Sequence, residues 1–303
     1  MFYLLGGISV ISLVFLIGAY HFSNLVIQPK TLNDQQVLEM MQEKHAAKLA
    51  AVENLSKVEV WLESPFGYKM RGWFYPNGSS QKTIILCHGI TMNLLHSIKY
   101  FYLFYERGFN VLLYDHRNHG RSGGHFTTLG YYEKQDLAAW VDWVSHRLGS
   151  HSIIGIHGES MGAATALQHG AIDHRVRFYI ADCSFSDLNA LLAFRLKADY
   201  RLPPFPWLPI SSLITYCRTK AHFQDVSPAA TIKAISAPVL FIHGSADTYI
   251  PPEMSIEMYR EKIGSKDLLL VEGAKHAKSI ETAPKTYEEA VDTFLKTVIS
   301  EQI

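Results

Sequence analysis

The stretch IIGIHGESMG, residues 153–162, is the part of the sequence that decides the fold. It starts as a short apolar run, typical of a buried strand, and continues through G-E-S-M-G into the alanine-rich residues 163–167, which favour a helix. A G-x-S-x-G sequence between a strand and a helix is typical of a nucleophile elbow, a sharp turn that exposes the serine hydroxyl above a sheet. The stretch therefore predicts that Ser160 is a nucleophile.

A serine hydroxyl needs a histidine as general base, and the histidine needs a carboxylate to orient it. In proteins with a nucleophile elbow, these residues follow the serine along the chain in the order Asp or Glu, then His. Of the 15 histidines only His276 follows the last predicted strand. Asp247 comes just after the preceding strand and is the expected acid. Asp182, at the end of an earlier strand, is the alternative.

The oxyanion of an acyl-transfer reaction needs two backbone N–H donors. One donor is expected from Met161, the residue after the nucleophile. The other is expected from the loop that follows the third strand, where Gly89 permits a tight turn before Ile90. The backbone amides of Ile90 and Met161 are therefore the predicted oxyanion hole.

Eight short runs of β type alternate with longer helical stretches after residue 56. The first two runs alternate in polarity, whereas the later ones, such as TIILC and PVLFI, are apolar throughout. Continuous apolar strands are typical of a parallel sheet covered by helices on both faces. The sequence predicts one doubly wound, mostly parallel α/β domain over residues 57–303, with strands at Val58–Leu62, Met70–Tyr75, Thr83–Cys87, Val111–Tyr114, Ile153–His157, Phe178–Ala181, Val239–His243 and Leu268–Val271.

A long interval between the sixth and seventh predicted strands shows no strand pattern. It contains RLPPFPWLP, residues 201–209, whose prolines interrupt regular helix. Insertions at the carboxyl end of a strand are common places for lids in α/β enzymes. We therefore expect a cap at about residues 185–237.

The composition excludes several classes of protein. The chain has 28 Lys and Arg residues and 28 Asp and Glu residues. It therefore lacks the excess of basic residues that is typical of a nucleic-acid-binding protein. Hydrophobic residues make up 48% of the chain, which is enough for a large core. Three cysteines without C-x-x-C spacing indicate neither a disulfide framework nor a zinc ribbon. We expect no metal and no cofactor.

The first 29 residues differ from the rest because they carry no Asp, Glu, Lys or Arg. Phe2–Phe22 is about as long as the roughly 20 apolar residues that cross a bilayer. We interpret residues 1–29 as a single-pass membrane anchor, with a cleaved signal peptide and a buried helix as alternatives. The sequence does not determine on which side of the membrane the catalytic domain lies. Residues 30–56 are expected to form a helical linker.

The motifs together resemble the α/β-hydrolase superfamily. They are His88-Gly89 after a strand, the polar Asp115–Gly123 loop, the elbow, and the segments that end at Asp247 and His276. Within that superfamily the chain is similar to membrane-anchored bacterial hydrolases of the Bem46-like group, which are esterase- or peptidase-like. The resemblance implies Ser160, Asp247 and His276 as a catalytic triad, without naming a substrate.

The sequence thus predicts a serine hydrolase that cleaves an ester or related acyl bond through an acyl-enzyme on Ser160. Aromatic residues of the expected cap, such as Phe205 and Trp207, favour apolar substrates with lipid-like or short acyl chains. A serine peptidase, a thioesterase and a non-catalytic binding protein with the same fold are the alternatives. The expected partners are a small acyl substrate and, through residues 2–22, a lipid bilayer; the oligomeric state is unknown.

Overall fold

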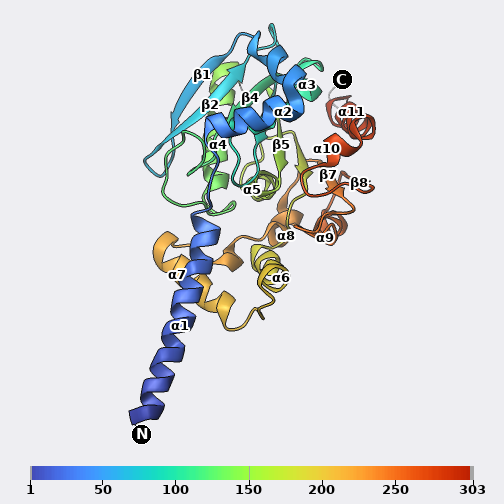
Figure 1. Cartoon of the computed structure of the whole chain (residues 1–303). Coiled ribbons are helices and arrows are strands. Elements are labelled where there is room, and N and C mark those ends of the chain that lie inside the picture. The colour runs from blue at the N-terminus through green and yellow to red at the C-terminus, as the bar shows by residue number, and fades with distance from the viewer. Residues whose placement is uncertain (1, 150, 301–303) are drawn as a thin grey trace.

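A computed structural model describes residues 2–149 and 151–300, and it leaves the side chains of residues 2–12 and 300 undescribed. One eight-stranded sheet forms the centre, in the order β1-β2-β4-β3-β5-β6-β7-β8 (Figure 1). The pairs β1–β2 and β2–β4 are antiparallel and all other pairs are parallel, so β2 alone runs against the direction of the other strands. The strands are β1 (Val58–Glu63), β2 (Lys69–Tyr75), β3 (Lys82–Cys87), β4 (Asn110–Tyr114), β5 (Ile153–Glu159), β6 (Phe178–Asp182), β7 (Val239–Gly244) and β8 (Lys266–Val271).

Helices cover both faces of the sheet, because strand residues point alternately to the two sides. Ile84 and Leu86 of β3 pack in one core cluster, and Ile85 and Cys87 in the other. The first face carries α2 (Asp34–Glu53), η1 (Leu94–Tyr100), α3 (Phe101–Tyr105), α10 (Ser279–Thr282) and α11 (Pro284–Ser300); the second carries α4 (Glu133–Leu148), α5 (Met161–Gly170), η3 (Ile232–Ala234) and α9 (Glu253–Glu261). The predicted mostly parallel, eight-stranded α/β-hydrolase fold is confirmed.

The long connection between β6 and β7 is helical. It contains α6 (Leu188–Tyr200), α7 (Trp207–Thr219), η2 (Phe223–Asp225) and α8 (Pro228–Thr231). Leu188, Leu191 and Leu208 of α6 and α7 join Met161 of α5 in a third apolar cluster. This cluster lies over the carboxyl end of β5, so these helices, called the cap below, cover the edge of the sheet where Ser160 stands.

The N-terminal region consists of two helices. Residues 34–53 form α2, which begins with a capping box between Asn33 and Gln36 and buries Val37, Met41, Leu49 and Val52 against the domain. The predicted anchor lies in α1 (Phe2–Ile27), which projects from the domain (Figure 1). Part of that prediction, residue 1 and the side chains of residues 2–12, falls outside the described residues. Within the described part, no helix combines the length and the apolar character needed to cross a membrane, so the structure gives the predicted transmembrane helix no support.

Candidate active site

Ser160 occupies a tight turn between β5 and α5. Its backbone has φ +55° and ψ −116°, a conformation that non-glycine residues rarely adopt. A Cβ atom on Gly158 would lie 2.3 Å from the carbonyl oxygen of Gly162, and one on Gly162 would lie 2.2 Å from that of Cys87. The two glycines therefore let the turn close against β3. The Ser160 amide donates a 2.8 Å hydrogen bond to the carbonyl of Asp182, which fixes the turn to the neighbouring strand.

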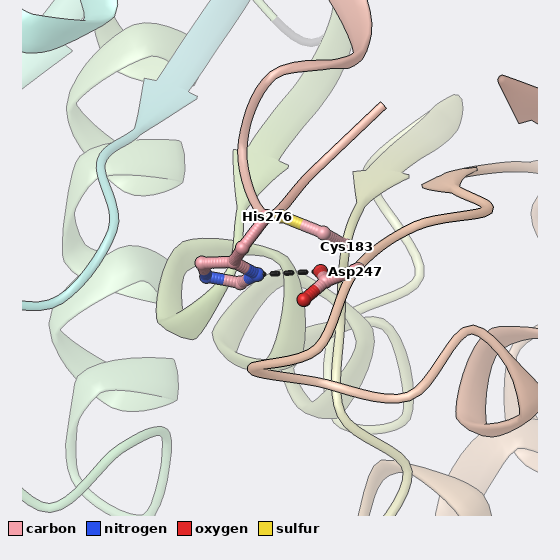
Figure 2. Close-up of side chains that lie close together, drawn as sticks. All are labelled: Cys183, Asp247 and His276. Atoms are coloured by element: carbon pink, nitrogen blue, oxygen red, sulfur yellow. Dashed lines mark hydrogen bonds and ion pairs between the residues drawn. The ribbon is translucent and has the colours of Figure 1, made fainter. Parts of the chain in front are cut away.

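The structure brings the three predicted triad residues together. His276 follows β8 and Asp247 follows β7, so both come from loops at the carboxyl edge of the sheet. The Nε2 atom of His276 lies 3.0 Å from the Ser160 hydroxyl, and its Nδ1 atom lies 2.7 Å from Oδ2 of Asp247 (Figure 2). Because an ionised carboxylate only accepts hydrogen bonds, Nδ1 is the donor, and Nε2 is left to accept the serine proton.

The Asp247 carboxylate is held in place by several donors. Oδ1 accepts hydrogen bonds from the amides of Tyr249 (2.8 Å) and Ile250 (2.9 Å), and Oδ2 lies 3.2 Å from Nε2 of His243. Burial alone would raise the pKa of Asp247, but the hydrogen bonds from His243, His276 and the backbone hold this pKa below its ordinary value. Asp247 therefore stays ionised and can stabilise an imidazolium on His276.

Asp182, the alternative acid, has different partners. Its Oδ2 accepts hydrogen bonds from the hydroxyls of Tyr100 and Tyr287, both at 3.1 Å, and its Oδ1 lies 3.4 Å from the Ser279 hydroxyl. Burial and the nearby Glu159 carboxylate raise the pKa of Asp182 to about 6. Among the described side chains it is Asp247, not Asp182, that reaches His276.

The two predicted oxyanion residues, Ile90 and Met161, line the same cavity as Ser160. Met161 begins α5, and Gly89, which precedes Ile90, is so close that a Cβ atom on it would lie 3.5 Å from Cβ of Ser160. Neither the Ile90 nor the Met161 amide donates to a backbone acceptor within the described chain. The Met161 amide stands at the start of α5, at the positive end of the helix dipole, and a second donor from the Ile90 amide would complete an oxyanion hole.

A network of buried charges beneath the elbow escaped the sequence-based prediction. The Lys99 ammonium group pairs with Glu159, the residue before the nucleophile, and also donates to the carbonyl of Ala277, which follows His276. Glu159 accepts a further bond from the Tyr100 hydroxyl at 2.6 Å and lies 3.3 Å from Nδ1 of His96. Burial would raise the pKa of Glu159, but Lys99 and His96 hold it well below its usual range. Lys99 thus connects the elbow with the histidine loop.

No local pattern marks this network in the sequence. Lys99 and Tyr100 stand in the aromatic run around η1, where a lysine is ordinarily expected at the solvent side. Their partners come from distant parts of the chain, β5 and the loop after β8. The one available signal is the acidic residue in the second position of the G-E-S-M-G motif, because a buried carboxylate next to the nucleophile requires a cation nearby.

A cavity of about 270 Å³ opens beside Ser160 under the cap. Its walls come from α1, α6, α7, the Ile90 loop and the loop after β7, and they are mostly apolar. Arg195 and Asp199 are its charged members, and they bind each other: Nε of Arg195 donates to Oδ2 of Asp199 at 3.0 Å, and Nη1 donates to the Thr248 carbonyl. The cavity therefore presents apolar surface and no unpaired charge among the described lining residues.

Cys183 lies next to the triad. With Asp247 and His276 it forms a group of three side chains of the types that bind metal ions. The ligand atoms of Cys183, Asp247 and His276 all lie within 4.8 Å of one another (Figure 2). Metal binding requires the thiolate, whereas burial raises the pKa of the Cys183 thiol well above its ordinary value. Asp247 and His276 are already bonded to each other, so the arrangement suits a proton-transfer chain better than a cation.

A serine at a nucleophile elbow, hydrogen-bonded through a histidine to a carboxylate, is the arrangement that acyl-transfer enzymes of this fold use. The family described as alpha/beta hydrolase fold matches residues 82–209. The uncharacterized protein YqkD of Bacillus subtilis is 40% identical over 276 residues, which are 90% of each chain. The alpha/beta hydrolase domain-containing protein WAV2 of Arabidopsis thaliana is 27% identical over 212 residues, 66% of this chain and 64% of that protein.

A solved structure resembles the whole domain. The Pyrococcus furiosus esterase Pf2001 is 26% identical and superposes with a TM-score of 0.66 over 83% of this chain and 94% of that chain. This structural likeness agrees with the 40% identity to YqkD and with the family match in the kind of fold that each indicates. The chain belongs to the alpha/beta hydrolase fold family.

Proposed function

We propose that this protein is a serine hydrolase of the carboxylesterase class that cleaves apolar acyl esters through an acyl-enzyme on Ser160. The observation that carries the proposal is the continuous hydrogen-bond chain from the Ser160 hydroxyl through both ring nitrogens of His276 to Asp247. The likeness to the Pyrococcus furiosus esterase and the apolar cavity beside Ser160 support an ester rather than a charged substrate.

The proposed reaction runs in two halves. His276 Nε2 takes the Ser160 proton while Oγ attacks the ester carbonyl, and the resulting oxyanion accepts hydrogen bonds from the amides of Ile90 and Met161. When the intermediate collapses, His276 returns the proton to the leaving alkoxide and the acyl group stays on Oγ. Water then attacks the acyl-enzyme with His276 again as base, and the carboxylic acid leaves with Ser160 restored. Asp247 keeps Nδ1–H oriented and stabilises the imidazolium.

The test compares hydrolysis of p-nitrophenyl butyrate by the full chain and by Ser160→Ala. We expect a loss of about 10⁴-fold or more in kcat, since removing the nucleophile leaves only binding and oxyanion stabilisation. Ser56→Ala, a matched change at an exposed serine, should keep the wild-type rate. A folded Ser160→Ala protein with near-normal activity would refute the proposal. Activity on peptide or thioester analogues but not on esters would shift the class to the corresponding alternative.

Placement at a lipid bilayer through residues 2–22, by a single-pass anchor as in the Bem46-like group, is part of the same proposal. Its support is the lack of charge in this segment and the exposure of its described apolar side chains, among them Leu13, Val14, Leu16 and Ile17. Full-length protein should then stay with membranes during carbonate extraction. Its recovery in the supernatant would reject the anchor.

A further inference from the structure

The last turns of α1 are fixed to the cap by specific polar contacts. The hydroxyls of Ser23 and Thr215 lie 2.8 Å apart and both residues are buried. Arg218 of α7 donates to the side chains of Asn24 (2.7 Å) and Gln28 (2.9 Å). Figure 1 shows α7 alongside α1 where α1 meets the domain. The end of α1 is therefore held against α7 of the cap by hydrogen bonds.

Trp207 of the cap is packed directly on α1. Its ring centroid lies 4.8 Å from that of Phe15 and 5.8 Å from that of Phe22. Gly18, between these two aromatics on the same helix face, leaves the space that the indole needs, because a Cβ atom there would lie 2.4 Å from Cζ3 of Trp207. Trp207 also lines the cavity beside Ser160, so the contact with α1 determines where one wall of that cavity stands.

The helix contributes side chains to the cavity itself. Phe22, Leu25 and Val26 of α1 line the same space as Ser160 and Met161. They face apolar side chains of α6, among them Leu188 and Leu191, which come from the cap. With its charged residues paired to each other, this space suits an uncharged hydrocarbon chain. Its volume, about 270 Å³, is near the lower end for small-molecule sites, which are about 300–1,000 Å³.

We infer that the end of α1 is part of the acyl-binding site, where Phe22, Leu25 and Val26 select esters of medium-chain fatty acids over acetates. The inference rests on the proposed esterase function and adds a substrate class and the residues that set it. Each buried methylene strengthens binding by about fourfold. A longer acyl chain has methylenes to bury against the α1 wall, whereas an acetyl group has a single methyl group and gains little from this contact.

The experiment measures kcat/KM of the full-length protein for p-nitrophenyl octanoate and p-nitrophenyl acetate. In Val26→Phe the added ring takes up part of the cavity that Val26 lines, so we expect the octanoate-to-acetate ratio of kcat/KM to fall by about tenfold or more, as the loss of one to two buried methylenes would give. Val26→Met, a less bulky change, should give a smaller fall in the same direction. Ile17→Phe is the matched control, because Ile17 lies on the same helix with 62% of its surface exposed and outside the cavity lining.

The outcomes separate this inference from the proposed function. An unchanged ratio in both folded Val26 variants would overturn the role of α1, as would an equal fall in Ile17→Phe. A wild-type protein that hydrolyses neither ester would instead refute the proposed function. If Val26→Phe fails to fold, Val26→Met decides the matter, and stoichiometric labelling of Ser160 by a fluorophosphonate verifies that its triad is intact.

Discussion

Beneath the elbow, Glu159, Lys99 and Asp182 lie buried in a hydrogen-bonded network, whereas above it Ser160 faces a cavity lined mainly by apolar side chains. The lower region comes from the sheet and from η1, and its charges are paired within the protein. The upper region comes from the cap and α1, and its apolar surface remains open. We interpret the difference as two separate roles: the lower region would hold the reacting groups in position, and the upper region would select the substrate.

The largest effect should separate the two candidate acids. Asp247→Asn keeps the shape of the side chain but favours the wrong tautomer of His276, so kcat should fall by about 10³–10⁴-fold at neutral pH. Asp182→Asn should cost less than about tenfold, because its carboxylate bonds to Tyr100 and Tyr287 and not to His276. Steady-state kinetics on one ester, with circular dichroism to verify folding, measures both. An inactive Asp182→Asn beside an active Asp247→Asn would reverse the assignment.

A second large effect concerns the stability of the lower region. Lys99→Met leaves the Glu159 carboxylate buried without its cation, and breaking a buried pair in this way costs about 3–5 kcal/mol. Urea unfolding should report that loss in the free energy of unfolding. The double variant Lys99→Met/Glu159→Gln should recover much of it, since no lone charge is left.

The control for this pair is Lys44→Met, at an exposed lysine, which should change stability by less than about 0.5 kcal/mol. A Lys99→Met protein as stable as the control would show that the network does not hold the elbow. An unrecovered double variant would show that the hydrogen bond from Lys99 to the Ala277 carbonyl, rather than the charge pair, carries the stability.

A smaller effect should appear as a pH dependence of stability at Asp182. Burial raises the pKa of Asp182 to about 6, above its unfolded value of about 3.9. Its proton therefore stabilises the folded state below about pH 4, and this contribution is lost as the pH rises through 6. Asp182→Asn cannot titrate, so its stability relative to wild type should improve by roughly 2 kcal/mol between pH 4 and pH 8. Unfolding measured at both pH values tests this, and a constant difference would contradict it.

The sequence predicted the triad and the sheet because both follow from local patterns. Ser160, Asp247 and His276 each stand just after an apolar strand, and chain order limits which can pair. Lys99 could not be found in this way, because its role depends on a strand and a loop that are remote in the chain. The same holds for α1. Its apolar composition suggests a membrane segment, but its contact with the cavity depends on the fit of Gly18 to Trp207, which only the folded structure reveals.

The role of Ser160 as the activated nucleophile is the central proposal, and covalent labelling tests it directly. The full-length protein is treated with a fluorophosphonate, digested, and the modified peptide is sequenced by mass spectrometry. The predicted result is one adduct per chain on Ser160, formed much more slowly in His276→Ala, because the imidazole activates the hydroxyl across a 3.0 Å hydrogen bond. A folded protein that carries no adduct, or carries it on another residue, would contradict the account.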